Sequence, residues 1–171
     1  MNERAAGRRA FSWCKAFTMW RLHCFILALL ACSSAALANS QAITLINGQK
    51  SIELSVAELR KSASLEFSLY DPYQAADVEM RGIPFRDFLI EHFGSVPSAL
   101  YFTAWDDYAV SLSGWDDPDW ILVTHENNQP LTLRGRGPLR LVERDYADRD
   151  TENLREFNDW LWMIRSIEAK W

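Results

Sequence analysis

Short runs in which apolar and polar residues alternate recur between turn signals along most of this chain. Leu65, Phe67 and Leu69 alternate with polar residues until Asp71-Pro72 ends the run. A period of two is typical of a strand with one buried face. The alternation therefore predicts many short strands, and a composition of 49% apolar and 24% charged residues is that of one globular domain rather than a coiled coil.

Turn residues between neighbouring apolar runs predict three hairpins. The paired segments are 43–46 with 51–54, 100–104 with 108–112, and 120–124 with 131–133, and their turns are Asn47-Gly48, Asp106-Asp107 and Asn127-Asn128. A short closing strand is predicted from the alternation of Ile167, Ala169 and Trp171.

Three helices are predicted between these strands. Ser55 and Glu58 have the spacing of a capping box, which predicts a helix of about two turns. A second helix is predicted to start near Pro84 and to end at Gly94, with Phe85, Phe88, Leu89 and His92 on one face. A third is predicted from the stripe Leu154, Phe157, Leu161 and Ile164. Together, these elements predict an α+β domain with mixed, mostly antiparallel strands.

Residues 1–38 have the composition of an export signal. They hold five basic residues and one acid, and their apolar run, 24–31, is shorter than the roughly 20 residues that span a bilayer. Ala36-Leu37-Ala38 fits a cleavage site, so the sequence predicts a signal peptide over 1–38 and a single periplasmic domain over 39–171. Alternatively, the segment 29–32 fits a lipoprotein site at which Cys32 would be acylated.

Charge and cysteine content exclude several classes of function. The formal net charge is −5 for the whole chain and −9 for residues 39–171, which argues against a general nucleic-acid binder. Cys14, Cys24 and Cys32 all lie in the predicted signal, so the domain has no thiol for a disulfide, a nucleophile or a metal site. His92 and His125 lie on different predicted elements, without metal-ligand spacing. A Ser/His/Asp triad stays open, although no motif points to one.

Aromatic and acidic residues gather at Trp105-Asp106-Asp107-Tyr108. A carboxylate beside aromatic rings suits a planar heterocycle with a guanidine-like edge, because the acid accepts two N–H bonds while the rings cover the π face. We therefore predict that these four residues bind a flat, nitrogen-rich ligand. The similar segment 115–120 is either a second functional cluster or a pair of acidic turns.

The carbonyl edge of such a ligand would need an arginine or a backbone amide. Arg134 and Arg140 lie in the glycine-containing segment 131–142 and are predicted to serve this edge. The alternative is a strand, a glycine-rich turn and a second strand whose guanidinium groups are solvated.

Four motifs, in this order and spacing, resemble the sulfite-oxidase-type molybdopterin-binding fold. They are Gly82-x-Pro84-x-x-Asp87-x-Leu89, Ala104-x-Asp106-Asp107-Tyr108, Gly137-Pro138-Leu139, and Trp162 with Ile167. The resemblance covers about residues 43–170, and it implies an α+β fold of mostly antiparallel strands with a few short helices.

The resemblance is closest to members of that fold family that are not enzymes. Catalytic members bind molybdenum through a cysteine between the first helix and the Gly-x-Pro helix, and the matching stretch 65–81 contains none. Small exported relatives with Ala-x-Asn/Asp-Asp-Tyr and Arg-x-x-Gly-Pro-Leu motifs also lack this cysteine and bind free pterins. They act as periplasmic sensing partners of membrane signalling proteins, notably regulators of cyclic di-GMP turnover.

This resemblance also implies site residues. Asp107 and Tyr108 would lie at a pterin pocket, with Arg134 near it. Tyr73 matches a position often held by tryptophan and would cover the ring. Trp162 is predicted instead to anchor the last helix in the core.

Three functions follow as hypotheses. The first is a non-catalytic periplasmic binding protein for a pterin-like ligand, without molybdenum, that reports occupancy to a membrane-bound cyclic di-GMP enzyme or sensor kinase. The second is a molybdopterin-dependent oxidoreductase-like protein that holds the metal without a cysteine. The third is an interaction module whose acidic surface docks a partner without a small ligand.

Overall fold

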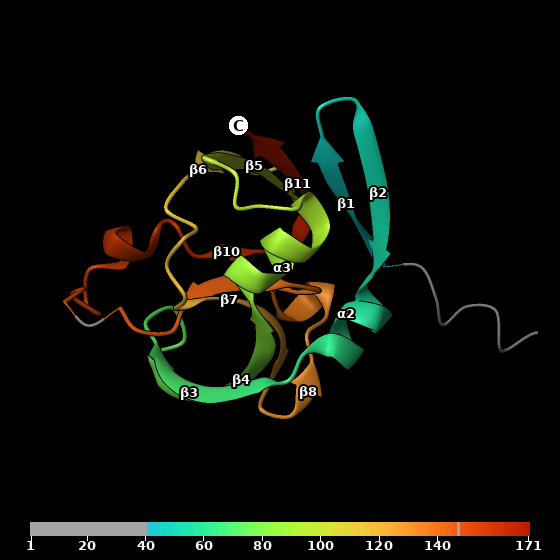
Figure 1. The fold of residues 1–171 in the computed structure, drawn as a ribbon. Helices are drawn as coiled ribbons and strands as arrows, with labels where there is room; N and C mark the ends of the chain where they lie inside the picture. Colours follow the sequence, from blue (N-terminus) through green and yellow to red (C-terminus); the bar gives the residue numbers. More distant parts are fainter. Residues whose placement is uncertain (1–40, 147) are drawn as a thin grey trace, which may run out of the picture. The chain divides into compact units, whose positions relative to one another are not determined.

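Two β-sheets and two short α-helices form the fold of the described residues (Figure 1). This computed structural model describes residues 41–146 and 148–171. The predicted export signal over 1–38, including Cys32, lies outside the described residues. Short helices combined with mostly antiparallel strands confirm the predicted α+β class.

The first sheet has five strands in the order β2-β1-β11-β5-β6. They are β1 (Ala42–Asn47), β2 (Lys50–Ser55), β5 (Ala99–Ala104), β6 (Ala109–Leu112) and β11 (Ile164–Lys170). β1 and β11 are parallel, and the other neighbours are antiparallel. Both hairpins predicted here are confirmed. The first turn consists of Gly48 and Gln49, one residue later than predicted, and Gly48 supplies the positive φ of 60°.

The second sheet has six strands, and all of its pairings are antiparallel. Its main order is β10 (Leu161–Trp162), β9 (Arg140–Glu143), β7 (Trp120–Glu126), β4 (Ala76–Pro84) and β3 (Leu65–Asp71), with β8 (Gln129–Pro130) paired to β7. β4 was not predicted. The predicted strand over 131–133 is wrong, because Thr132 O accepts the N–H groups of Gly135 and Gly137 and closes the 3₁₀ turn η1 (Leu133–Gly135).

Two of the three predicted helices are confirmed as α2 (Val56–Ser62) and α3 (Phe85–Phe93). Ser55 is the N-cap of α2 but makes no side-chain capping bond, so the capping-box contact is absent from the described helix. Gly94 ends α3 with a φ of 85°, as predicted. Neither described helix has the length and apolarity of a membrane span.

The predicted helix over 154–164 is wrong. Leu154–Phe157 is the 3₁₀ turn η2, and β10 and β11 follow it. Met163 lies between these strands with a φ of 57°, and a bulge follows Ile164 in the pairing of β11 with β5. Each irregularity inserts one residue into an extended segment. The spacing between neighbouring buried residues then becomes about three residues instead of two, which resembles the spacing on one face of a helix.

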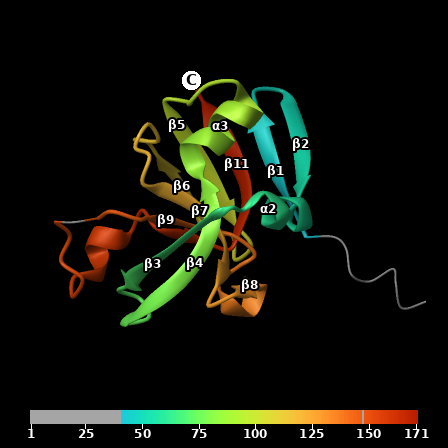
Figure 2. The ribbon, with the colours of Figure 1, turned by 60° about the horizontal axis from the view of Figure 1, so that its bottom comes forward.

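Trp115 joins the two sheets and α3 in one aromatic cluster. Its ring lies edge-on to Phe85 of α3, Phe102 of β5 and Trp120 of β7, with centroid distances of 5.3–5.5 Å. Figure 2 shows the same part of the fold from a second direction, with α3, β5 and β7 in view. The segment 115–120 therefore contributes to the core through its tryptophans, and its acidic residues form a turn.

Gly82 of β4 lies against β7, where no side chain fits. A Cβ atom would lie 2.5 Å from Leu122 O and 2.7 Å from Ile121 Cγ2. Because Leu122 O is a backbone atom, the two strands would have to separate. We expect Gly82→Ala to lower the free energy of unfolding by about 1–3 kcal/mol, as overpacking does, when it is measured by chemical denaturation.

Gly135→Ala is the matched control for this substitution. A Cβ atom there would meet only Thr132 Oγ1, at 3.7 Å. A Gly→Ala change without strain stabilises a protein by about 0.4–1 kcal/mol through the unfolded chain. Equal effects of the two substitutions would contradict the close approach of β4 and β7.

Candidate functional site

A cavity of about 250 Å³ lies between segments of the two sheets. It is lined by Tyr73, Ala104, Asp106, Tyr108, Asn158, Trp160, Leu161 and Trp162. Ala104 ends β5 in the first sheet, whereas Leu161 and Trp162 form β10 in the second. The cavity therefore brings together the predicted ligand-binding residues Tyr73, Asp106 and Tyr108.

The chain crosses from the second sheet to the first at Met163, directly after the residues that line the cavity. β10 ends at Trp162, and β11 begins at Ile164, which pairs with Ala104. Met163 O accepts the N–H of Trp105 at 2.8 Å. Backbone hydrogen bonds thus fix the crossover to the turn that follows β5.

The turn over 105–108 presents alternate residues to its two sides. Ala104 N–H donates to Tyr108 O at 2.8 Å, and Asp107 N–H donates to Ala104 O at 3.2 Å. Asp106 Oδ1 accepts the N–H of Tyr108 at 3.2 Å. Asp107 has a φ of 65°, a conformation that aspartate adopts more readily than most residues. Asp106 and Tyr108 consequently line the cavity.

The other two residues of this turn contact Arg165 instead. The Asp107 side chain is 83% exposed, and its Oδ1 lies 3.1 Å from Arg165 Nη2. The Arg165 guanidinium lies 6.0 Å from the ring centroid of Trp105, which is also exposed. Trp105 and Asp107 were predicted to bind the ligand, but the structure does not bring them to the cavity lining.

Tyr73 and Trp162 form one wall of the cavity. Their ring centroids are 4.9 Å apart, and their planes meet at 81° in an edge-to-face contact. Tyr73 OH donates to Phe157 O at 2.9 Å. Burial raises the pKa of Tyr73, and the carboxylate of Asp159 raises it further. Trp162 is half-buried on a strand, which corrects the prediction that it anchors a helix in the core.

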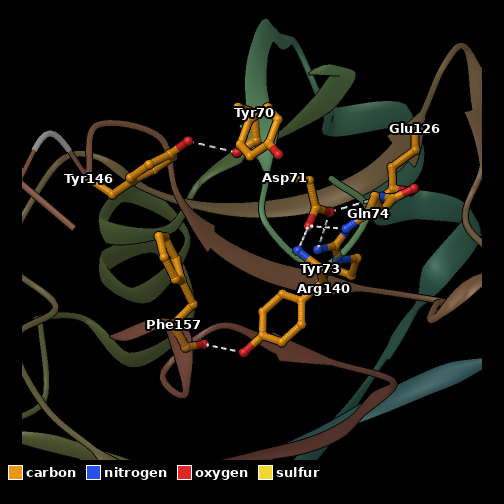
Figure 3. Close-up of polar contacts among 8 residues, drawn as sticks. All are labelled: Tyr70, Asp71, Tyr73, Gln74, Glu126, Arg140, Tyr146 and Phe157. Atoms are coloured by element: carbon orange, nitrogen blue, oxygen red, sulfur yellow. Dashed lines mark hydrogen bonds and ion pairs between the residues drawn. The ribbon is translucent and has the colours of Figure 1, made fainter. Parts of the chain in front are cut away.

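A buried ionic network holds the segment that carries Tyr73 (Figure 3). Arg140 Nη2 donates to Asp71 Oδ2 at 2.9 Å, and Arg140 Nη1 donates to Glu126. Asp71 Oδ1 accepts the backbone N–H of Tyr73 at 2.9 Å. Gln74 Nε2 donates to both carboxylates, at 2.9 Å to Asp71 and 3.2 Å to Glu126. The carboxylate of Asp71 thus fixes the backbone that places Tyr73.

Arg140 acts through this network rather than at the cavity surface. It is 1% exposed, and it pairs across the strands with Trp162, so it supports both aromatic residues of the wall. Burial alone raises the pKa of Asp71, but the charge of Arg140 and the hydrogen bonds to the carboxylate hold that pKa below its usual value. Arg134 is exposed on η1. Neither predicted arginine lines the cavity, and Arg140 is a positioning residue.

Sequence reasoning missed five residues of the lining as ligand-binding residues, namely Ala104, Asn158, Trp160, Leu161 and Trp162. Trp160 is 2% exposed and contacts Phe157 edge-on at a centroid distance of 5.1 Å. The aromatic pair at 160 and 162 was a signal for this wall. The pair was assigned to a helix in the sequence analysis, so its position next to the turn over 105–108 could not be inferred.

His125 lies in a second cavity, of about 340 Å³, on the second sheet. Arg81 Nη2 lies 2.7 Å from His125 Nε2. Because a guanidinium only donates, Nε2 accepts this bond, and Nδ1 lies 2.7 Å from Thr124 Oγ1 and 3.4 Å from Arg81 Nε. Burial lowers the pKa of His125, and the charges of Arg81 and Arg60 lower it further. A neutral histidine with both nitrogens bonded has a structural role here.

The donor atoms near the expected molybdenum position do not fit a thiolate centre. The stretch 65–81 forms β3, a turn and most of β4, and its one sulfur atom belongs to Met80, which is 2% exposed. Across 41–146 and 148–171, no three His, Cys, Asp or Glu side chains are placed to hold a metal ion.

Comparisons with known proteins assign no family to this chain. A scan against protein-family models finds no match, and a search of curated proteins finds none either. The case for the candidate site therefore rests on the geometry of the cavity and on its chemistry.

Proposed function

We propose that this protein is a non-catalytic binding protein for a flat, pterin-like heterocycle, and that the ligand occupies the 250 Å³ cavity. One observation supports this most directly. The carboxylate of Asp106 lies in the same lining as the rings of Tyr73, Tyr108 and Trp162. An acceptor for N–H groups is thereby combined with aromatic surfaces for a planar ring.

The free acceptor capacity of Asp106 suits the guanidine-like edge of such a ring. Oδ1 accepts one backbone N–H, from Tyr108, whereas Oδ2 accepts no hydrogen bond from the residues described. Asn158 adds an amide that both donates and accepts, which suits a carbonyl edge. Asn158 takes the place of the arginines that were expected at the carbonyl edge, whereas Asp106 was itself among the predicted residues.

The size of the cavity favours a single bicyclic ring. Its volume is slightly below the range of about 300–1,000 Å³ that is common for ligand sites. A complete dinucleotide form of a molybdenum cofactor would need more room. The proposed ligand is therefore a free pterin or a ring of similar size.

The signalling part of the proposal follows from the resemblance. An exported protein that binds a pterin without chemistry would act by reporting occupancy to a membrane-bound partner, such as the periplasmic domain of a cyclic di-GMP enzyme or a sensor kinase. Small molecules released on denaturing the protein purified from its native compartment would identify the ligand.

Asp106→Asn tests the binding site. The substitution keeps the shape but removes the charge that accepts the N–H pair, and hydrogen bonds to charged groups contribute about 1.5–3 kcal/mol. We expect the Kd for pterin to rise by about 10- to 100-fold, measured by isothermal titration calorimetry and by quenching of tryptophan fluorescence.

Asp107→Asn is the matched control, since Asp107 neighbours Asp106 but is 83% exposed and lies outside the lining. Asparagine also tolerates the φ of 65° at this position. Its Kd should stay within about twofold of the unmodified protein. No saturable binding by the unmodified protein below about 1 mM, or equal losses in the two variants, would overturn the proposal.

A further inference from the structure

The cavity lining carries a single formal charge. Asp106 is its one ionisable carboxylate, and none of the eight lining residues is a lysine, an arginine or a histidine. Asp106 is exposed at the mouth of the cavity, and Tyr108 beside it is 53% exposed, so the charge of Asp106 acts on a ligand through partly solvated surroundings and its effect depends on the salt concentration. The lining is therefore suited to a ligand that brings no negative charge of its own.

Two arginines near the lining are already paired with carboxylates. Arg165 pairs with Asp107 at 3.1 Å, and Arg140 pairs with Asp71 at 2.9 Å. Because these guanidinium groups neutralise acids outside the lining, they contribute less positive electrostatic potential to the cavity.

Acids on the neighbouring elements act in the same direction. Arg149 contacts Asp159 at 2.7 Å and also Glu143, so two carboxylates share one cation next to Asn158. The raised pKa of Tyr73 comes first from burial and then from Asp159 and Asp71. An excess of negative charge thus surrounds the cavity, in keeping with the net charge of −9 over 39–171.

We infer that the cavity selects its ligand by charge, and that it accepts neutral or positively charged flat rings while it excludes rings with carboxylate or phosphate substituents. The inference rests on the proposed function, because it concerns the same cavity and names the class of ligand within it. A phosphorylated or carboxylated pterin would bring a second negative charge into the small cavity that already holds Asp106, and no lining cation would compensate for it.

The test compares three probes on the purified protein by isothermal titration calorimetry at low salt and near neutral pH. Pterin is neutral, pterin-6-carboxylate has the same ring with an anion, and 2-aminobenzimidazole is a flat ring with a guanidine-like edge that is not a pterin. We expect pterin-6-carboxylate to bind at least about tenfold more weakly than pterin. Raising the salt concentration should reduce this difference.

Asp106→Asn separates charge from shape. The variant should bind pterin more weakly but should narrow the difference between pterin and its carboxylate to less than about threefold, because the one formal charge of the lining is gone. The matched control Asp107→Asn should keep the full difference. Equal or tighter binding of the carboxylate by the unmodified protein would overturn the inference. Arg136 lies outside the lining, and its backbone carbonyl accepts the N–H of Met163 at 3.0 Å. Loss of such binding in Arg136→Gln would assign it to this cation.

The outcomes distinguish this inference from the proposed function. If pterin and its carboxylate bind equally well, the charge selection fails while the pterin site stands. If only 2-aminobenzimidazole binds, and does so through Asp106, the charge selection stands while the pterin assignment fails. Binding of none of the three probes would overturn both.

Discussion

Replacing Arg140 with methionine is expected to lower the free energy of unfolding by about 3–5 kcal/mol, the usual cost of removing one partner of a buried ion pair. Asp71 is 0% exposed and Arg140 is 1% exposed. Without the guanidinium, Asp71 and Glu126 would face each other across Gln74 with no cation between them. Chemical denaturation monitored by tryptophan fluorescence would measure the loss.

Arg144→Met is the matched control for Arg140→Met. Arg144 pairs with Asp119 at the surface, where the two side chains are 41% and 23% exposed. An exposed pair of this kind contributes about 0–1 kcal/mol. If Arg140→Met does not fold well enough to be measured, Asp71→Asn tests the same pair from the other side. Similar effects of the buried and the exposed pair would contradict the importance of the network.

The contribution of Asp71 to the pH dependence of the free energy of unfolding should also change sign in Arg140→Met. In the unmodified protein the pKa of Asp71 is lowered, so its contribution is complete above the unfolded value of about 3.9 and is lost as the pH falls below it. Without Arg140, burial, which is the largest influence on this pKa, would raise it against the hydrogen bonds that Gln74 and the Tyr73 N–H still donate. Acidification toward the unfolded value would then protonate Asp71 in the folded state and recover part of the lost stability.

Local signals in the sequence were sufficient for two of the three hairpins, for the turn of the third, and for two helices. Gly48 and Gly94 have positive φ angles where a turn and a helix end were predicted. Phe85, Phe88 and Leu89 are buried on one face of α3, as their spacing indicated. β4 had a similar signal in the alternation of the buried Val78 and Met80, but it was overlooked.

The C-terminal segment could not be assigned from its spacing. The positive φ of Met163 and the bulge after Ile164 depend on tertiary pairing with β5 and on the crossover between the sheets. A sequence pattern records which residues are buried, but not the irregularities that shift them. The helix predicted there had the wrong period, and its first residue, Leu154, is exposed, whereas Phe157, Leu161 and Ile164 are buried as predicted.

The candidate site was predicted in composition but not in detail. The resemblance indicated Asp107, whereas the geometry of the turn brings Asp106 to the cavity and turns Asp107 toward Arg165. The order of the four residues did not predict which carboxylate faces the cavity, because the conformation of the turn decides this. Arg140 was predicted at the ligand, and only the three-dimensional structure reveals its buried carboxylate partners.

Trp115→Ala is expected to lower the free energy of unfolding by about 3–5 kcal/mol, because the cavity left behind would separate α3 from both sheets. The indole is 1% exposed, and its Nε1 donates to Leu112 O at 3.1 Å. Trp105→Ala is the matched control, since that indole is 38% exposed and contacts Arg165 at the surface. Trp115→Phe keeps most of the ring and should lose less. Thermal and chemical unfolding would measure all three variants, and equal losses at Trp115 and Trp105 would contradict the central place of Trp115 in the core.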